Sequence, residues 1–147
     1  MGAQEIPIRW ARDREDVRGA LAVRERVFCG EQGVPREEEI DGHDDRALHL
    51  VALDPDRREV IGTLRLLLDG EHAKVGRVAV ERDWRRHGIA ARMLELALVQ
   101  ARARGCVQVR LAAQLAATEL YRQAGFAVES DEFEEAGIQH VWMGKRL

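Results

Sequence analysis

Residues 76–94 read GRVAVERDWRRHGIAARML, and this stretch decides which fold the sequence predicts. A short apolar strand over Val78 to Val80 gives way to a charged turn, after which Gly88 opens a helix. This order aims backbone N–H groups and the positive end of a helix dipole at one small volume, which suits an anion such as phosphate. Gly88 lets the backbone approach that anion closely, while Ala90 and Ala91 keep bulky side chains away from it.

The pattern Arg85-x-x-Gly88-x-Ala90 also fits an ordinary helix start with one small residue. A P-loop is excluded because no Gly-Lys-Ser/Thr follows the glycine, and a dinucleotide-binding loop is disfavoured because only one of its glycines is present. The phosphate-loop interpretation therefore depends on the rest of the chain. On that interpretation the residues around the ligand are Arg85, Arg86, His87, Gly88, Ile89, Ala90 and Ala91.

Length and composition indicate one folded domain over residues 1–147. The chain is 46% hydrophobic and 33% charged, which is typical of a globular protein. Its net charge of −3, from 23 basic and 26 acidic residues, does not favour a nucleic-acid partner. No membrane span or signal peptide is visible, and Cys29 and Cys106 lie far apart, which favours reduced thiols and a cytoplasmic location. The histidines are scattered, so no metal site is predicted.

Hydrophobic periodicity and turn residues predict the order of the elements. Strands are predicted over residues 6–10, 48–53, 60–68, 73–80, 107–112, 126–129 and 138–145. Helices are predicted from an N-cap at Asp13 to Gly30 or Gly33, over 88–104 and over 118–124. The acidic run at 37–45 is expected to be a loop or a frayed turn. Together these give an α/β, or α+β, fold: a mixed, mostly antiparallel twisted sheet of six to seven strands with about four helices.

A second motif lies downstream, where residues 117–126 read ATELYRQAGF. With the loop quoted above, this segment resembles the GCN5-related N-acetyltransferases (GNAT). That family carries Gln/Arg-x-x-Gly-x-Gly/Ala after a strand, and later an Ala-x-x-Leu/Phe-Tyr-x-x-x-Gly-Phe box on a short helix. The matching positions here are Ala117, Leu120, Tyr121, Gly125 and Phe126. The two motifs occur in the right order and separation, and the resemblance covers essentially the whole chain.

The resemblance implies a fold with a V-shaped splay between the fourth and fifth strands, and acetyl-CoA as the cosubstrate. The loop then binds the pyrophosphate, and a bulged strand over Val78, Ala79 and Val80 pairs with the pantetheine arm through its free backbone groups. It also implies direct transfer of the acetyl group to a primary amine, with Tyr121 as the general acid on the leaving thiolate. Gln114 is a further candidate contact to pantetheine or acceptor, or else a turn cap.

The general base and the acceptor site each have more than one candidate residue. His140 lies in an Ile-x-His-x-x-Met stretch similar to the glyphosate N-acetyltransferase-like and ElaA-like branches, where the resemblance implies a base; alternatively it is a polar residue on an edge strand. Glu31, acting through water, is a second candidate. Acceptor contacts are expected from Glu31, Gln32 and Arg65. The acidic run at 37–45 is either a solvated loop or a rim that attracts a cationic amine.

Two other functions stay open at this point: a non-catalytic acyl-CoA-binding or sensing module, and a protein whose arginine-rich loop binds nucleic-acid phosphates. Cys29, Gly76 and Gln114 occupy positions where a phosphonate-binding site is expected to have arginines, which argues against a small dianionic acceptor. The predicted acceptor is a small-molecule or peptide amine. Dimers are common in the family, which leaves a homodimer open, because no feature of this sequence determines the oligomeric state.

Overall fold

Residues 5–147 are described by a computed structural model, and within them eight strands form one mixed sheet in the order β1-β2-β3-β4-β5-β8-β6, with β7 attached to β8. Only β4 and β5 pair in parallel, so the predicted mixed, mostly antiparallel sheet is confirmed. The strands are β1 (Ile8–Trp10), β2 (Leu48–Leu53), β3 (Val60–Asp69), β4 (His72–Val80), β5 (Gln108–Gln114), β6 (Ala127–Val128), β7 (Phe133–Glu135) and β8 (Ile138–Arg146). The strand that the sequence did not predict is β7, a short hairpin partner of β8.

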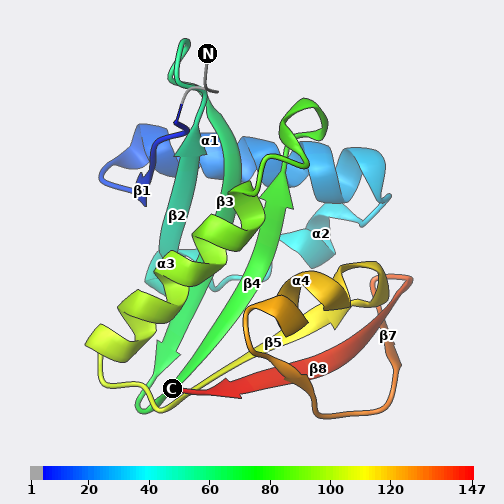
Figure 1. Cartoon of the computed structure of the whole chain (residues 1–147). Helices are drawn as coiled ribbons and strands as arrows, with labels where there is room; N and C mark the ends of the chain where they lie inside the picture. The colour runs from blue at the N-terminus through cyan, green and yellow to red at the C-terminus, as the bar shows by residue number, and fades with distance from the viewer. Residues whose placement is uncertain (1–4) are drawn as a thin grey trace.

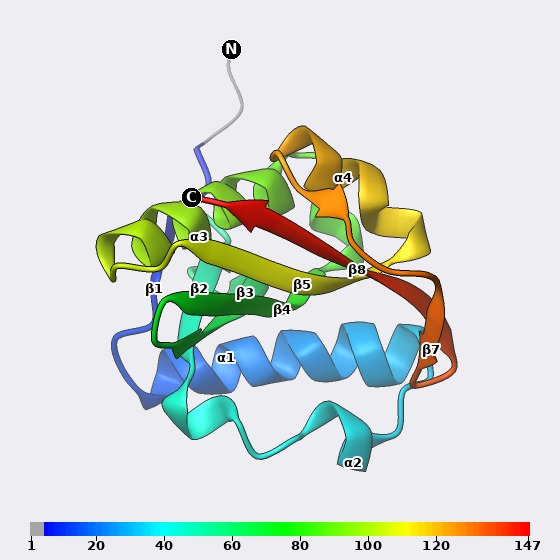
Figure 2. The same cartoon turned by 90° about the horizontal axis from the view of Figure 1, so that it is seen from below.

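Helices cover both faces of this sheet. In Figure 1, α3 crosses in front of the sheet and α1 runs behind it; Figure 2 shows α3 and α4 on one face and α1 and α2 on the other. The helices are α1 (Arg14–Arg24), the π-helix η1 (Glu25–Glu31), α2 (Arg36–Glu39), α3 (Ile89–Ala103) and α4 (Thr118–Gln123). Short 3₁₀ turns are η2 (Asp44–Arg46), η3 (Arg82–Trp84) and η4 (Leu115–Ala117). No helix in the described part is long and apolar enough to cross a membrane.

The first helix begins and ends where the sequence predicted. Asp13 caps it by accepting a hydrogen bond of 2.9 Å from the backbone N–H of Asp16. The helical path continues through η1, and the N–H of Gln32 still donates to the carbonyl of Val27, five residues earlier, at 3.1 Å. Gly33, with φ +70°, ends it. The switch from α to π geometry over Glu25–Glu31 was not predicted.

The helix α3 follows the predicted pattern closely. Gly88 precedes it with φ +73°, and Gly105 ends it with φ +83°, both in the left-handed region that favours glycine. Its buried stripe includes Met93 and Leu94, which are fully buried in the main core against β3 and β4. Burying each of these side chains stabilises the fold by about 2 kcal/mol. This packing holds the N-terminus of α3 in place against the sheet.

The sheet divides between β4 and β5. These strands pair only over residues 72–74 and 108–110, after which β4 continues to Val80 and β5 to Gln114 without further pairing. Figure 1 shows the two strands separating beyond this short contact. The V-shaped splay between the fourth and fifth strands is therefore confirmed.

A bulge in β4 lies beside this splay. Thr63 of β3 pairs with Ala79, whereas Arg65 pairs with Gly76, so β4 holds one more residue than β3 across this interval. Within that interval Arg77 has φ +54°, an uncommon conformation for a residue other than glycine. The bulge therefore lies on the stretch of β4 that continues past its pairing with β5.

The acidic run at 37–45 differs from the expectation of a loop or frayed turn. Its start belongs to α2 and its end to η2. Glu39 is buried, and it lies against the guanidinium group of Arg24, which is only 1% exposed. The segment folds because buried arginines draw its carboxylates inward, an attraction that no local sequence pattern reveals.

Candidate active site

A cleft of about 890 Å³ opens where β4 and β5 separate. It brings together most of the site residues that the sequence predicted. Those that line it are Gln32, Arg65, Val78, Ala79, Val80, Arg85, Arg86, Gly88, Ile89, Ala90, Ala91, Gln114, Tyr121 and His140. Glu31 and His87 are not among the lining residues; His87 is exposed and lies beside the ring of Trp84, with the ring centroids 6.2 Å apart.

The start of α3 contributes backbone donors to this cleft. The first hydrogen bond of the helix runs from the N–H of Arg92 to the carbonyl of Gly88, at 3.1 Å. The N–H groups of Ile89, Ala90 and Ala91 precede it, and no side chain in the described part of the chain caps them. Because these donors coincide with the positive end of the helix dipole, the geometry suits an anionic group.

Arg85 is engaged within the protein. Its Nε donates to the carbonyl of Val80 at 2.8 Å, and its Nη2 donates to both carboxylate oxygens of Glu31 at 3.0 and 2.9 Å. The expectation that the carbonyl of Val80 is free is therefore wrong in this structure, because the Arg85 side chain folds back over the end of β4. The carboxylate of Glu31 is likewise ion-paired.

The edge of β4 that faces β5 has no strand partner beyond Lys74. Backbone groups along this edge can pair with an extended ligand that carries amides of its own, as a new strand does. Val78 lies on this stretch and lines the cleft. The side chain of Ala79 is instead buried against Val23 and Val27, so only its backbone can contribute to a ligand site.

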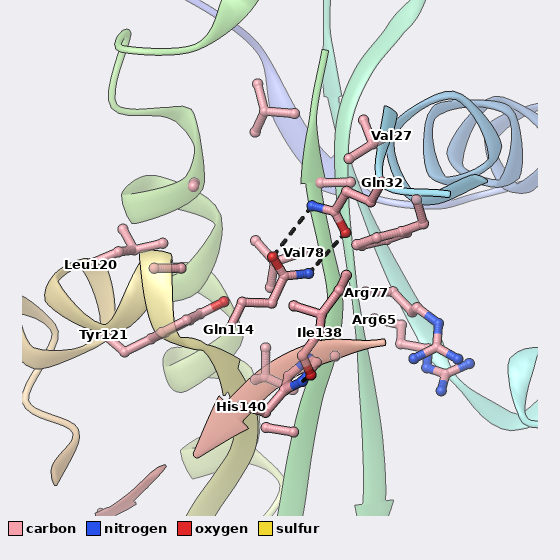
Figure 3. A pocket seen from close by; sticks show the side chains of 18 of the residues that line it. Val27, Gln32, Arg65, Arg77, Val78, Gln114, Leu120, Tyr121, Ile138 and His140 are labelled. Carbon is pink, nitrogen blue, oxygen red and sulfur yellow. Dashed lines mark hydrogen bonds between the residues drawn. The ribbon is translucent and has the colours of Figure 1, made fainter. Parts of the chain in front are cut away.

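Tyr121 reaches the cleft from α4. Figure 3 shows its hydroxyl pointing toward the gap in which Gln114 lies. The ring is 6% exposed and packs edge-on against Phe126, with centroids 6.2 Å apart. Burial raises the pKa of Tyr121 to about 12, since desolvation disfavours the phenolate. The hydroxyl is therefore protonated at neutral pH and has a proton that it can donate.

His140 reaches the cleft from β8. Its Nδ1 lies 2.7 Å from the carbonyl oxygen of Ile138, and a carbonyl only accepts, so Nδ1 carries the hydrogen. In the neutral ring, Nε2 then holds a free lone pair; it lies 3.9 Å from a carboxylate oxygen of Glu135. Phe133 stacks on the imidazole at 5.7 Å. At His140, β8 is paired on both sides, so the edge-strand alternative is wrong.

Two glutamines meet in the middle of the cleft. Gln114 Nε2 donates to Gln32 Oε1 at 2.9 Å, and Gln32 Nε2 donates back to Gln114 Oε1 at 3.3 Å. Figure 3 shows this reciprocal pair, with Tyr121 and His140 both below it in the view. Gln114 is the last residue of β5, not a residue just past it as the sequence suggested.

A cleft at the splayed strands, an uncapped helix N-terminus and a buried phenol agree with the match of residues 16–147 to the "Acetyltransferase (GNAT) domain" family. The chain belongs to the GNAT acetyltransferase family. It is therefore an N-acetyltransferase of the GNAT type, as the sequence predicted.

Individual relatives agree with this membership in the GNAT family. The "uncharacterized N-acetyltransferase YjcF" of Bacillus subtilis is 34% identical over 139 residues, covering 92% of this chain and 96% of that protein. An acyl-CoA N-acyltransferase from Pseudomonas aeruginosa has a similar structure, with a TM-score of 0.84 and 26% identity, covering 96% of this chain and 99% of that chain. Escherichia coli ElaA shares the fold, with a TM-score of 0.84, 24% identity and coverage of 96% and 99%.

Beside this GNAT cleft, the acidic run meets three arginines in what we call the arginine–carboxylate cluster. Its members are Arg24, Arg65, Arg77, Glu39, Asp41 and Asp44. Arg24 bonds to Glu39 at 2.6 Å and to Asp44 at 2.7 Å. The three positive and three negative charges compensate one another. The prediction of an acidic rim or a freely solvated run is therefore wrong for these three carboxylates, because buried arginines neutralise them.

The cluster connects the acidic run to the bulge in β4. Arg77 Nε donates to Glu39 Oε2 at 2.9 Å, which ties α2 to the bulged strand. Arg65 binds Asp41 through both terminal nitrogens, and these bonds hold the pKa of Asp41 well below its usual range. The pKa of Asp44 is also lowered. Burial opposes this shift, because it disfavours the charged carboxylate, but the hydrogen bonds and charges of Arg24 and Arg65 have the larger combined effect.

Sequence reasoning missed the cluster and the glutamine pair. Arg24 did carry a signal, because it falls on the apolar stripe of α1, where a charged residue must find buried partners. Arg77 carried none, since its role depends on the bulge. Gln32 and Gln114 are 82 residues apart, and no local pattern predicts that they meet.

Proposed function

We propose that this GNAT protein transfers the acetyl group of acetyl-CoA directly to a primary amine of a small molecule or a peptide. One observation carries the proposal: a single cleft holds a protonated phenol, Tyr121, and an imidazole with a free Nε2 lone pair, His140, near the gap between the splayed strands. The first can release a proton and the second can take one up, and the transfer needs both.

The donor end of the cleft consists of the start of α3, the free edge of β4 and Tyr121. The pyrophosphate is expected at the N–H groups of Ile89, Ala90 and Ala91, and the pantetheine amides along β4 beside Val78. The likeness to the Pseudomonas aeruginosa acyl-CoA N-acyltransferase supports an acyl-CoA donor. When it binds, the thioester carbonyl can accept a hydrogen bond from a backbone N–H of β4 as negative charge develops on it.

The acceptor end consists of Gln32, Arg65, Arg77, Ile138 and His140. An amine with a pKa of about 10 is mostly protonated at neutral pH and must lose a proton before it attacks. Nε2 of His140 takes that proton, the nitrogen bonds to the thioester carbon, and the C–S bond breaks. The leaving thiolate takes a proton from the hydroxyl of Tyr121, and the nitrogen of the new amide loses its second proton, which returns the Tyr121 oxygen to its protonated form. No enzyme-bound acyl intermediate forms.

A panel of amines assayed with acetyl-CoA for thiol release tests the proposal. We expect turnover of at least one primary amine, and protection of the protein by coenzyme A in thermal unfolding. Thermal protection without any turnover across polyamines, aminoglycosides, amino acids and peptides would instead identify an acyl-CoA sensor. Binding to DNA with a steep salt dependence, and no affinity for coenzyme A, would identify the nucleic-acid alternative.

The role of His140 has a separate test. We expect His140→Gln to lower kcat/KM about 100- to 10,000-fold at neutral pH without weakening coenzyme A binding. The deficit should shrink as pH rises toward the pKa of the amine, because the amine then loses its proton without help. If His140→Gln keeps full activity while Glu31→Gln loses it, the base is Glu31 acting through water.

A further inference from the structure

Glu135 places a carboxylate beside the ring nitrogen of His140 that holds the free lone pair. Its Oε2 lies 3.9 Å from Nε2 of His140, and both residues line the cleft. Glu135 is the last residue of β7, which runs beside β8 as its antiparallel partner (Figure 2). Its side chain is 58% exposed, so a ligand that enters the cleft can reach the carboxylate.

The strand pairing keeps Glu135 in this position. Phe133 pairs with His140 and Glu135 pairs with Ile138, which fixes the register of β7 against β8. Because side chains alternate along a strand, Phe133 and Glu135 lie on the same face, and Phe133 stacks on the imidazole at 5.7 Å. A two-residue turn with positive φ at both positions joins the strands, as in a tight hairpin. The carboxylate therefore stays within reach of the imidazole.

The positive charges around the acceptor end do not neutralise Glu135. Arg65 and Arg77 are bound by carboxylates of the arginine–carboxylate cluster. Lys74 lies on the part of β4 that still pairs with β5, with its Nζ 5.2 Å from the centroid of the Trp142 ring. Within residues 5–147, Glu135 forms no ion pair with an arginine or a lysine. Its charge is therefore available to a cation from outside the protein.

We propose that Glu135 binds the acceptor in its protonated form, so that the substrate class is a cationic primary amine and not a neutral arylamine. The inference rests on the proposed function, since the ammonium group is that of the amine to be acetylated. One N–H of the ammonium donates to Oε2 of Glu135 and another donates to Nε2 of His140. Two acceptor atoms 3.9 Å apart can both lie about 2.9 Å from one nitrogen.

This arrangement also gives the proton a balanced path. Nε2 of His140 takes a proton from the ammonium, and the electrons of that N–H bond stay on the nitrogen as the lone pair that attacks the thioester carbon. The resulting imidazolium lies beside the carboxylate of Glu135, and the opposite charges attract until the imidazolium releases its proton to water. A neutral arylamine brings no positive charge into the cleft, so Glu135 gives it no such advantage.

The experiment compares two probes with the same skeleton, ethylamine and 2,2,2-trifluoroethylamine. The fluorine atoms withdraw electrons, so only ethylamine is a cation at neutral pH. Thiol release gives kcat/KM, and a probe that is not turned over is measured as a competitive inhibitor of the best amine of the panel. We expect Glu135→Gln to weaken the use or binding of ethylamine about tenfold, mainly through KM, the effect of one hydrogen bond to a charged group. The value for trifluoroethylamine should change less than about twofold.

Two further variants separate charge from structure. Glu134→Gln removes the neighbouring carboxylate of β7, which lies outside the cleft on the opposite face of the strand, and should leave both probes unchanged. Glu135→Asp keeps the charge and should lose less ethylamine activity than Glu135→Gln. Coenzyme A affinity and thermal unfolding should match the wild type in all three variants.

Failure of this inference and failure of the proposed function give different results. If the wild-type protein acetylates no amine, the proposed function is wrong and the role of Glu135 falls with it. If the protein acetylates amines but Glu135→Gln leaves ethylamine unaffected, or weakens both probes equally, Glu135 does not recognise the charge and the transfer stands. A wild-type preference for aniline over ethylamine also contradicts a cationic acceptor.

Discussion

The proposed donor end of the cleft is made mainly of backbone groups, whereas the proposed acceptor end is made of charged and amide side chains. At the donor end the free N–H groups follow Gly88, and the free strand edge includes Val78. At the acceptor end Arg65 and Arg77 are held by carboxylates of the acidic run. The first arrangement depends on the local course of the chain, and the second on which distant side chains meet.

This difference has a physical consequence for what each end tolerates. Backbone donors survive most substitutions, provided that the chain keeps its path, and Gly88 is the position where the path depends on residue type. The buried charges at the other end compensate one another, so removing a single partner leaves a charge uncompensated. The donor end should therefore lose binding when its backbone changes, and the acceptor end should lose stability when its charges change.

The largest expected effect is on chemistry at the donor end. Tyr121→Phe removes the proton donor while keeping the buried ring against Phe126, and we expect kcat to fall about 100- to 10,000-fold. Steady-state thiol release at saturating substrates measures it. Coenzyme A affinity and thermal stability serve as controls and should stay near the wild-type values. An unchanged kcat would show that the thiolate leaves without help from Tyr121.

The next effect is on stability at the acceptor end. Glu39→Gln leaves the guanidinium groups of Arg24 and Arg77 without their shared carboxylate, and we expect a loss of about 3 kcal/mol in the free energy of unfolding. Urea denaturation measures it. Glu129→Gln, which breaks the exposed pair with Arg110, is the matched control and should cost at most about 1 kcal/mol. Equal losses in the two variants would show that burial of the cluster does not increase the cost of removing a carboxylate.

A smaller effect is expected on coenzyme binding. A Cβ added at Gly88 meets no atom within 4 Å, so Gly88→Ala tests the left-handed backbone alone. Strain of about 1 kcal/mol should shift the loop and weaken coenzyme A binding about tenfold, measured by calorimetry. Gly105, at the far end of α3, also has a positive φ and open surroundings, so Gly105→Ala is the matched control. The Gly105→Ala variant should lose a similar amount of stability but keep full affinity for coenzyme A. Weaker coenzyme A binding in both variants would contradict a specific role of the Gly88 loop in that binding.

The smallest effect concerns acid stability. Arg65 lowers the pKa of Asp41 in the folded protein. The ion pair therefore stabilises the fold fully at a pH above the ordinary Asp pKa of about 3.9. This stabilisation is lost as the pH falls through the lower pKa that Asp41 has in the folded protein. We expect Asp41→Asn to lose about 1 kcal/mol at neutral pH and to show a flatter decline below a pH of about 4. Urea midpoints across pH measure it. Asp56→Asn, in an exposed turn, should follow the wild-type curve.

Much of the fold follows from residues whose effect is local. Asp13 caps α1 through a bond to a residue three positions away, and Gly88 and Gly105 bound α3 through their own φ angles. The same holds for the placement of Tyr121, because α4 begins and ends within a few residues of it. Such features are predictable since the interacting groups are neighbours in the chain.

The sequence alone determined the elements of the proposed donor end: a strand, a glycine and a helix start lie within one short stretch, and their geometry is set by backbone rules. Only the tertiary structure decided the acceptor end. Arg24 meets Glu39 across 15 residues, Arg65 meets Asp41 across 24, and Gln32 meets Gln114 across 82. Any arginine can pair with any carboxylate within reach, so the partners are chosen by how the sheet and helices bring the side chains together.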